Sequence, residues 1–352
     1  MLRTKMGKRG VVVALIVALT CAFAASAGAI TIHVPADQST IQAAIDAANT
    51  GDLVLVSPGT YTENIDFHGK AITVRSMSGA PTTIIDGGNV GTVVTFQTGE
   101  TTKSVLTGFT IQHGSASFGA GITMLGASAT ITRNIFRNNA QGSGGFGAAI
   151  GGNSASPVVE RNLFTQNTCD TQFLSGVVSF VNSSSPLIIN NIFERNPCRA
   201  INMTLPTGNS PVVANNTIVQ NSVGVRVDAR VVTAEQLYAN NILVGNQVGL
   251  EVDFLNTGNE PTWTNNLVSS NPTNYSGIAD ETGTNGNISA NPKFVSLTKL
   301  NLHLLAGSPA IDAGTLSVPK LPSTDYAGNP RVVDGNGDGV ALPDMGAYEL
   351  IP

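Results

Sequence analysis

The feature that most constrains the fold is a six-residue pattern that recurs about every 25 residues. It consists of Asn, two mostly apolar residues, two variable residues and a second Asn; its copies begin at Asn134, Asn162, Asn191, Asn216, Asn241 and Asn266. A degenerate copy ends at His113. Strand-like alternation fills each period and leaves no room for a helix. The sequence therefore predicts an all-β fold, a parallel β-helix with two or three short strands in each coil.

The repeated Asn residues suit a stack of coils. Neighbouring coils lie about 4.8 Å apart, so identical Asn side chains in one column can hydrogen-bond along the stack. The alternative is that these side chains bind a ligand. Because stacking alone explains the columns, we interpret the Asn residues as structural.

Composition excludes several classes of protein. Hydrophobic residues make up 41% of the 352 residues and the formal net charge is only −5, so the chain can build a core and is not predicted to be disordered. One N-terminal stretch alone is apolar enough for a membrane, which excludes a polytopic membrane protein. The acidic balance, without a basic run beyond the N-terminus, gives no support for nucleic-acid binding.

The N-terminus has the pattern of an export signal. Four cations between Arg3 and Arg9 precede an apolar run over 11–25, and small residues in A-x-A spacing end at Ala29. This order predicts a signal peptide over 1–29, an exported mature protein and no stable membrane span after cleavage. The alternative is a membrane anchor, which the short run of small residues disfavours.

Two cysteines occupy equivalent positions in adjacent coils. Cys169 lies seven residues after the first Asn of its coil, and Cys198 lies seven residues after the first Asn of the next. Neighbouring coils are within disulfide reach, and export permits oxidation. We therefore predict a Cys169–Cys198 disulfide, with two buried free thiols as the alternative.

A short helix is predicted at the start of the mature chain. Ser39 and Gln42 form a capping-box pattern, apolar residues follow at helical spacing, and Gly51 can end the helix. Such a helix would cover the open strand edges of the first coil. The residues after it, 52–56 and 58–61, are predicted to form the first strand and a turn.

The stretch from Ile41 to Ile65, which ends in Pro-Gly-Thr-Tyr-Thr-Glu-Asn-Ile, resembles the entry to the pectin-lyase-like superfamily of right-handed β-helix proteins. Together with the Asn coils, the resemblance covers about 30–275. It implies a right-handed coil and an association with carbohydrate, but no particular reaction. Residues 59–63 are also similar to one pectin methylesterase motif, yet the segments that carry the catalytic residues of that family have no counterpart here.

The C-terminal part has its own motifs, from Asn291 through 307–314 and 325–331 to 344–349. They resemble the C-terminal module of the bacterial choice-of-anchor β-helix proteins, which implies a secreted, cell-surface or periplasmic location. We therefore expect a C-terminal module over 276–352, irregular in structure, that caps the second end of the coil.

An Asp-rich loop in this module resembles the first half of an EF-hand calcium site. Asp334, Asn336 and Asp338 place oxygen ligands at alternate positions, with Gly residues between them. Position 12 is Met345 instead of Glu, and Asp344 could take its place. Calcium is therefore the one expected cofactor, and a solvated Gly/Asp turn is the alternative.

Four charged residues form the predicted catalytic cluster. Arg226 and Glu251 each lie ten residues after the first Asn of their coils, and Asp228 and Asp253 each lie twelve after it. The shared register stacks the two Asp residues about 5 Å apart on an outward face. Such a pair could hold a cation, transfer protons or act as the carboxylates of a retaining glycosidase. The alternative is a solvated face with one compensating ion pair.

Other candidates are weaker. Arg230 could serve as a lyase base, although surface arginines are common. The four His residues are scattered in the sequence and suggest neither a zinc cluster nor a triad. Tyr238, Trp263 and Tyr275 are too dispersed to predict an aromatic platform for sugars.

These observations give two functional hypotheses. The first is a monomeric exported protein that binds or processes extracellular polysaccharide, as a lyase or glycoside hydrolase if it is an enzyme at all. The second is a non-enzymatic surface, adhesion or spacer protein that uses the elongated coil as a contact face. The sequence leaves open whether the protein is an enzyme.

Overall fold

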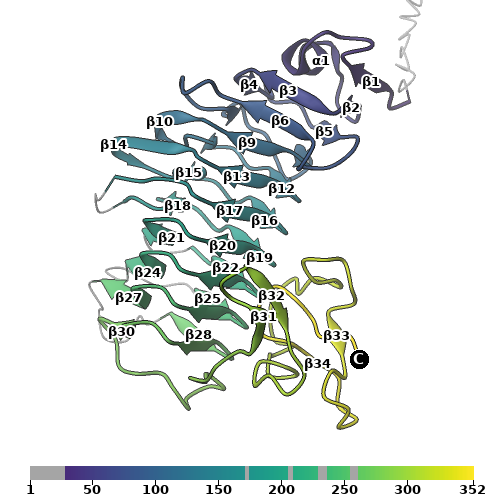
Figure 1. The fold of residues 1–352 in the computed structure, drawn as a ribbon. Coiled ribbons are helices and arrows are strands. Elements are labelled where there is room, and N and C mark those ends of the chain that lie inside the picture. The colour runs from purple at the N-terminus through teal and green to yellow at the C-terminus, as the bar shows by residue number, and fades with distance from the viewer. Residues whose placement is uncertain (1–27, 171–173, 205–208, 229–235, 254–260) are drawn as a thin grey trace, which may run out of the picture.

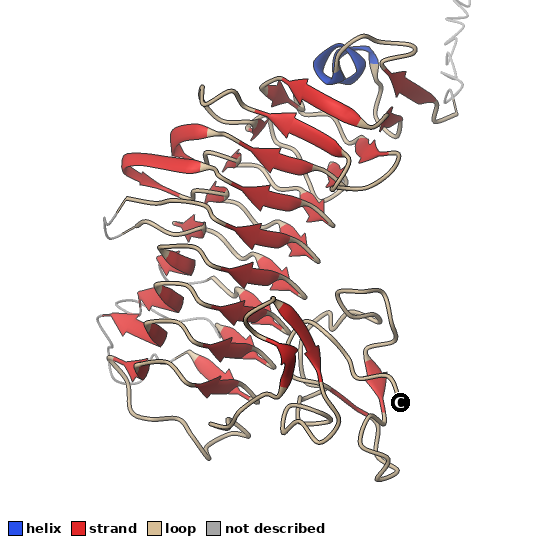
Figure 2. Ribbon diagram, in the orientation of Figure 1, coloured by secondary structure: helices blue, strands red, loops and turns tan. Residues whose placement is uncertain are grey.

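The computed structural model describes residues 28–170, 174–204, 209–228, 236–253 and 261–352. They form a right-handed parallel β-helix, as predicted, with an irregular C-terminal region along one side of the lower coils (Figure 1). Three long parallel sheets run the length of the stack, and the one described helix lies at its N-terminal end (Figure 2).

We call the three sheets A, B and C. The A sheet contains, in order, β1 (Thr31–Val34), β2 (Leu53–Val56), β5 (Thr73–Ser76), β8 (Val105–Thr107), β12 (Thr130–Thr132), β16 (Val158–Glu160), β19 (Leu187–Ile189), β22 (Val212–Ala214), β25 (Leu237–Ala239) and β28 (Thr262–Thr264). The B sheet contains β3 (Gly59–Thr62), β6 (Thr83–Asp86), β9 (Thr110–Gln112), β13 (Ile135–Arg137), β17 (Leu163–Thr165), β20 (Ile192–Glu194), β23 (Thr217–Val219), β26 (Ile242–Val244) and β29 (Leu267–Ser269).

The C sheet contains β4 (Ile65–Asp66), β7 (Val94–Phe96), β11 (Ile122–Leu125), β15 (Ile150–Asn153), β18 (Val178–Val181), β21 (Arg199–Thr204), β24 (Val223–Asp228), β27 (Val248–Asp253) and β30 (Thr273–Ser276). Three pairs of strands lie outside these sheets: β10 (Ser115–Phe118) with β14 (Ala140–Phe146), β31 (Phe294–Ser296) with β32 (Asn301–Leu304), and β33 (Val332–Val333) with β34 (Leu342–Pro343).

The Asn pattern forms the two corners that flank each B strand. The residue before each ladder Asn has a left-handed backbone, as at Asn190 with φ of 56° and Arg195 with φ of 51°. The ladder side chains point inward: Nδ2 of Asn191 donates to Oδ1 of Asn216 at 3.0 Å, and its Oδ1 accepts from the backbone N–H of Asn162 at 2.9 Å. The ladder side chains are buried, which confirms their structural role.

Aromatic side chains stack inside the coil in the same register. The rings of Phe136, Phe164 and Phe193 lie on consecutive coils, with centroids 4.9 and 4.5 Å apart. Tyr238 and Trp263 also stack, at 4.3 Å, and both are buried. These two aromatic residues are therefore neighbours in space, where they fill the core.

The predicted N-terminal helix is present as α1 (Ile41–Ala47), but its cap differs from the prediction. Thr40 is the N-cap and accepts the N–H of Ala43 at 3.1 Å, so the capping box at Ser39 was wrong. The reason lies in the next coil: the carboxylate of Glu63 accepts the first two helical N–H groups at 3.0 Å each. A negatively charged carboxylate at the N-terminal end of a helix also interacts favourably with the helix dipole.

Two strand assignments near this end also differ. β1 precedes the helix and pairs in parallel with β2, so 52–56 does not hold the first strand. Residues Gly59–Thr62 form β3, which pairs with β6, instead of a turn. The chain therefore enters the coil before the helix and returns to it immediately afterwards.

The C-terminal region does more than cap the coil. Asn287 continues the ladder by accepting the N–H of Asn266 at 2.9 Å, so 277–291 covers the last coil. The rest lies beside the lower coils (Figure 1) and is held by outward-pointing Asn residues that precede the ladder Asn residues. Asn240, for example, donates to the carbonyl of Thr315 at 3.0 Å and accepts the N–H of Thr315 at 2.8 Å.

The predicted signal peptide falls on residues 1–27, outside the described part of the chain, and on the two residues that follow. Among the described residues, no helix combines the length and the apolar character that a membrane span requires.

Candidate functional site

The four charged residues of the predicted cluster lie in the predicted register. In the ladder between β24 and β27, Arg226 is opposite Glu251 and Asp228 is opposite Asp253. The stacking prediction is therefore confirmed at the level of the backbone.

Their environment differs from the prediction. Arg226 is completely buried and Asp228 is 3% exposed, so this part of the face is not a solvated one. Nε of Arg226 donates to Oδ2 of Asp253 at 2.8 Å, and Nη1 donates to Oδ1 of Asn202 at 2.8 Å. Asp253 keeps about a third of its side chain exposed. The carboxylate of Asp253 is thus bound to a buried guanidinium.

Arg226 belongs to a column of outward-pointing positions on the C sheet. In the upper coils, chain segments packed outside the sheet bury this column. A Cβ on Gly151 would lie only 2.7 Å from the carbonyl oxygen of Phe146, so β14 packs directly on the sheet there. One coil lower, the carbonyl of Leu174 accepts from Ser179 at 2.7 Å and from Asn202 at 2.8 Å. Alternation within a strand does not reveal such coverings, because they come from segments outside the three sheets.

Glu251 remains accessible and pairs with a different arginine. Its carboxylate lies 3.4 Å from Nε of Arg199, and both side chains keep about a fifth of their surface exposed. Together with Asp170 they line a cavity of about 200 Å³. Of the four predicted residues, Glu251 is therefore the one that lines this cavity.

A second hollow of about 470 Å³ adjoins this cavity across the corner between the B and C sheets. Pro197 and Ser222 line both, so the two form one surface, which we call the corner groove. Its other polar lining residues are Asp170, Ser175, Arg195, Asn196, Arg199, Gln220, Asn221, Gln247 and Glu251.

The corner groove lies on a row of outward-pointing side chains. The two lowest coils have Gly245 and Ser270 in this row, both with left-handed backbones. Above them lie five residues with the same backbone conformation: His113, which precedes Gly114, and Asn138, Gln166, Arg195 and Gln220, each of which precedes the second ladder Asn of its coil. All five carry planar polar groups and are at least partly exposed. Within the row, Nε of Arg195 donates to Oε1 of Gln220 at 3.1 Å. The row therefore offers donors and acceptors at the spacing of the coils.

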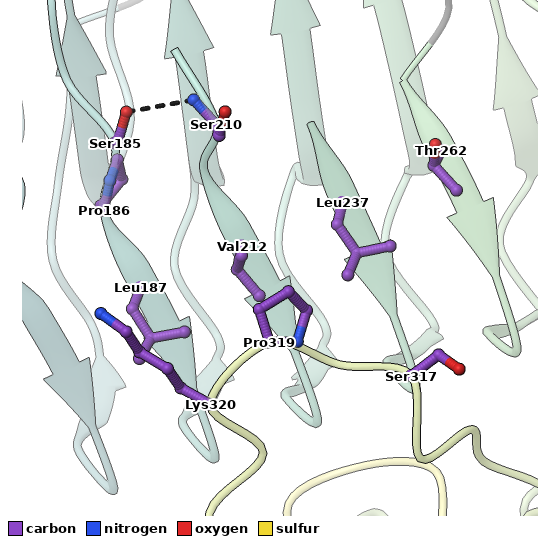
Figure 3. Close-up of a pocket in the computed structure, with 10 residues that line it drawn as sticks. All are labelled: Ser185, Pro186, Leu187, Ser210, Val212, Leu237, Thr262, Ser317, Pro319 and Lys320. Carbon is purple, nitrogen blue, oxygen red and sulfur yellow. Dashed lines mark hydrogen bonds between the residues drawn. The ribbon is translucent and has the colours of Figure 1, made fainter. Parts of the chain in front are cut away.

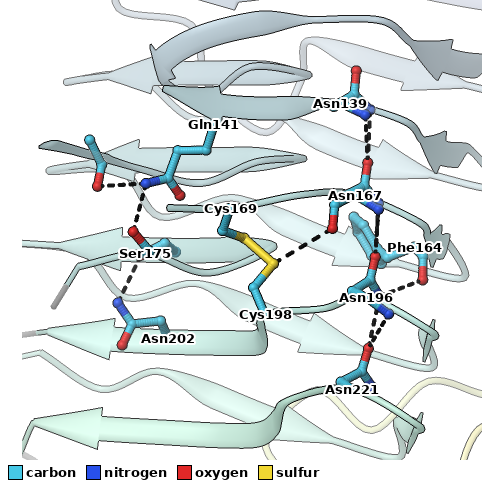
Figure 4. The surroundings of a disulfide bond; sticks show 12 residues. Asn139, Gln141, Phe164, Asn167, Cys169, Ser175, Asn196, Cys198, Asn202 and Asn221 are labelled. Carbon is cyan, nitrogen blue, oxygen red and sulfur yellow. Dashed lines mark hydrogen bonds between the residues drawn. A yellow bond between two sulfur atoms is a disulfide. The ribbon is translucent and has the colours of Figure 1, made fainter. Parts of the chain in front are cut away.

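The predicted disulfide is present and forms part of the groove wall. Cys169 and Cys198 are bonded, with Cα atoms 5.8 Å apart, on adjacent coils beside the Asn ladder (Figure 4). Both line the smaller cavity. The bond ties the turn that carries Asp170 to the strand that begins at Arg199.

A titratable cluster that sequence reasoning missed lies at the upper end of the row. Nδ1 of His113 lies 2.9 and 3.1 Å from the two carboxylate oxygens of Asp86. Gln112 donates to the same carboxylate at 2.7 Å, and its Oε1 accepts from Arg137 at 2.8 Å. A His oriented by a carboxylate in this way can accept and donate protons at its other ring nitrogen.

The signal for this cluster was the coil period. Asp86 and His113 are 27 residues apart, close to one coil, so the period places them on adjacent coils. His33, His68 and His303 lie elsewhere, and Arg230 falls outside the described residues.

In the Asp-rich loop, carboxylate oxygens accept hydrogen bonds from backbone N–H groups of the same loop. The carboxylate of Asp334 accepts the N–H groups of Gly337 and Gly339 at 2.7 and 2.9 Å. Asp344 is buried in the C-terminal region, where it accepts the N–H of Leu350 at 2.7 Å, and burial raises its pKa to about 6. Within the described residues, no three His, Cys, Asp or Glu side chains are grouped as metal ligands would be. The structure therefore does not bring Asp344 to Asp334, Asn336 and Asp338.

Comparison with known proteins agrees with the fold. Residues 71–234 match the family model described as the right-handed beta helix region. No curated protein matches the sequence.

Several solved structures are similar at low sequence identity. Pectate lyase Pel9A has 15% identity and a TM-score of 0.44, with 92% of this chain and 97% of that chain covered. A pectin methylesterase in complex with a hexasaccharide has 11% identity and a TM-score of 0.32, with 76% and 94% covered. A mannuronic-acid-specific family 6 polysaccharide lyase from human gut microbiota has 13% identity and a TM-score of 0.31, with 77% and 89% covered.

Proposed function

We propose that the protein is exported and binds polysaccharide in the corner groove. The observation that carries the proposal is the convergence there of guanidinium, amide and carboxylate groups from adjacent coils. Arg195, Gln220 and Gln247 lie on one side of Pro197 and Ser222, and Arg199 and Glu251 lie on the other.

These groups suit the hydroxyl-rich surface of a sugar. Amides both donate and accept, guanidinium groups donate in a fixed plane, and carboxylates accept with two oxygens. The coils repeat such groups at intervals of about 4.8 Å, so a polymer with repeating units can meet equivalent partners along the row. The sequence resemblance to the pectin-lyase-like superfamily supports the same class of ligand.

The location is part of the proposal. A disulfide between adjacent coils is typical of proteins that fold in an oxidising compartment. The N-terminal pattern supports export, and the resemblance to choice-of-anchor proteins supports a bacterial surface, secreted or periplasmic location. We propose a monomer, because the coil ends are covered by α1 and by 277–291 within one chain.

If the protein also processes the polysaccharide, the groups that transfer protons must lie in the same groove. Glu251 is the carboxylate of the predicted cluster that lines it, and Arg199 is its neighbour. We assign Arg226 and Asp253 to supporting the strands beneath, with Asp228 beside them. Calcium, held by Asp334, Asn336, Asp338 and Asp344, remains a separate proposal, because these residues would have to rearrange to share an ion.

The test is binding of the mature protein to polyuronates and neutral glycans by affinity electrophoresis, with and without calcium. We expect retardation on at least one glycan and at least tenfold weaker binding for Arg199→Gln and Gln220→Ala. Arg75→Gln, which removes an exposed arginine from the A sheet, is the matched control and should bind normally. Unsaturated products and new reducing ends, measured in parallel, report turnover.

Retention of full binding by both groove variants would show that the glycan binds elsewhere. Absence of binding to every glycan would overturn the proposal in favour of the rival function, a surface or spacer protein. Glu251→Gln separates binding from processing, since it should abolish turnover if this carboxylate transfers protons.

A further inference from the structure

A further cavity lies on a different face of the coil from the corner groove. It occupies about 610 Å³ between the outer face of the A sheet and the segment 317–320 of the C-terminal region (Figure 3). Its floor consists of Leu187, Val212 and Leu237, which are consecutive in the ladder of β19, β22 and β25.

The wall of this cavity is anchored in the fold. Val318 is 5% exposed and packs in an apolar cluster with Ile189, Ala214 and Ala239, which lie on the same three strands as the floor residues. This contact holds 317–320 over the sheet. The floor side chains lie beside this segment and are not covered by it, so they are only half-buried.

The polar groups lie at opposite edges of the floor. Ser185 and Ser210 mark the upper edge in Figure 3, where the N–H of Ser210 donates to Oγ of Ser185 at 3.0 Å. Lys320 lies at the lower edge, beside Leu187. Among the described lining residues, Lys320 is the one that carries a charge.

We propose that this cavity binds an amphiphilic organic anion, such as a medium-chain aliphatic carboxylate. Three side chains at a strand spacing of about 4.8 Å give an apolar floor about 10 Å long, which suits an extended hydrocarbon chain. The Lys320 ammonium pairs with the carboxylate at the edge. A cavity of this size, apolar with a few polar groups, has the properties of small-molecule sites. The site is independent of the corner groove and of any glycan.

The test uses the mature protein and decanoate in isothermal titration calorimetry, with the neutral decanol as a second ligand. Val212→Trp should fill the cavity and weaken decanoate binding at least tenfold. Val158→Trp is the matched control, because Val158 is the preceding half-buried residue of the same column and lies outside the cavity. It should leave binding unchanged.

Lys320→Gln isolates the charge and, as an exposed substitution, should not affect folding. We expect it to weaken decanoate binding about tenfold and to leave decanol binding unchanged. The proposal is overturned if decanoate does not bind the wild type, if Val158→Trp weakens binding as much as Val212→Trp, or if Lys320→Gln affects decanol and decanoate equally.

Discussion

The guanidinium of Arg226 binds the carboxylate of Asp253 on the next coil, with Nη2 and Nε 2.7 and 2.8 Å from the same oxygen. The ladder places Asp253 two residues beyond the position opposite Arg226, so the ion pair runs diagonally across the strands. A fully buried guanidinium that lost this partner would keep its charge in a medium of low polarity.

The first prediction concerns that ion pair. Asp253→Asn should lower the free energy of unfolding by about 1–3 kcal/mol, less than for a fully buried pair because Asp253 is partly exposed. Adding Arg226→Met should recover part of this loss, since the buried charge is then removed. Urea unfolding of the two variants provides the measurement. A double variant less stable than the single one would contradict the assigned role.

The second prediction concerns the Asn ladder. Asn191 donates to the carbonyls of Val159 and Ile189 at 2.9 and 3.0 Å, in addition to its two ladder partners. Asn191→Ala leaves several buried groups without partners and should cost about 3–5 kcal/mol. Asn138→Gly, at an exposed corner where φ is already 54°, should change stability little. Equal effects of the two in urea unfolding would argue against the ladder.

The disulfide gives a third prediction. It closes a segment of 29 residues, for which loop entropy predicts a loss of about 3–4 kcal/mol in a Cys169→Ser/Cys198→Ser variant. Thiol titration of the denatured, unreduced mature protein should detect neither cysteine, and reduction should release both. Two reactive thiols before reduction would exclude the bond.

A fourth prediction follows from Asp86. Burial acts to raise its pKa, but hydrogen bonds from Gln112, the Gly88 N–H and His113 outweigh it, so the pKa of Asp86 lies below its ordinary value. A carboxyl with a lower pKa in the folded state binds fewer protons when folded, so it stabilises the fold at high pH. This contribution is complete above the unfolded pKa of about 3.9 and is lost as pH falls through the folded pKa.

The measurement for Asp86 is urea unfolding between pH 2.5 and 7. Asp86→Asn should lack this part of the acid-induced loss of stability, and Gln112→Leu should reduce it. If all three proteins show the same pH dependence, Asp86 is not the group responsible.

The sequence predicts the fold well because the fold is periodic. The ladder position of Asn191 and the pairing of Asp228 with Asp253 both follow from counting within a coil. The neighbouring Asn190 shows the limit: its side chain accepts from Arg331 at 2.5 Å, 141 residues away, and no period encodes that contact. The burial of Arg226 did not follow from the period either, because counting within a coil gives the register of a side chain but not its hydrogen bonds to Asn202 and, diagonally, to Asp253.

The last prediction tests how the C-terminal region is attached. The side chain of Asn240 hydrogen-bonds to both the N–H and the carbonyl of Thr315, as the backbone of a neighbouring strand would. Asn240→Ala removes both hydrogen bonds and should lower the free energy of local opening of this region by about 1–3 kcal/mol. Amide exchange at Thr315 should then accelerate about 10- to 100-fold, measured by hydrogen exchange at the peptide level.

The control for Asn240 is Asn138→Ala, which introduces Ala at the same left-handed backbone conformation in an upper coil. It carries the same backbone cost and should leave exchange at Thr315 unchanged. A second variant, Asn265→Ala, removes the bond to the carbonyl of Ala313 at 2.9 Å and should accelerate exchange in the same segment. If both lower-coil variants leave 313–320 protected, the apolar contacts around Val318 hold the region without the Asn residues, and the cavity above the A sheet persists in their absence.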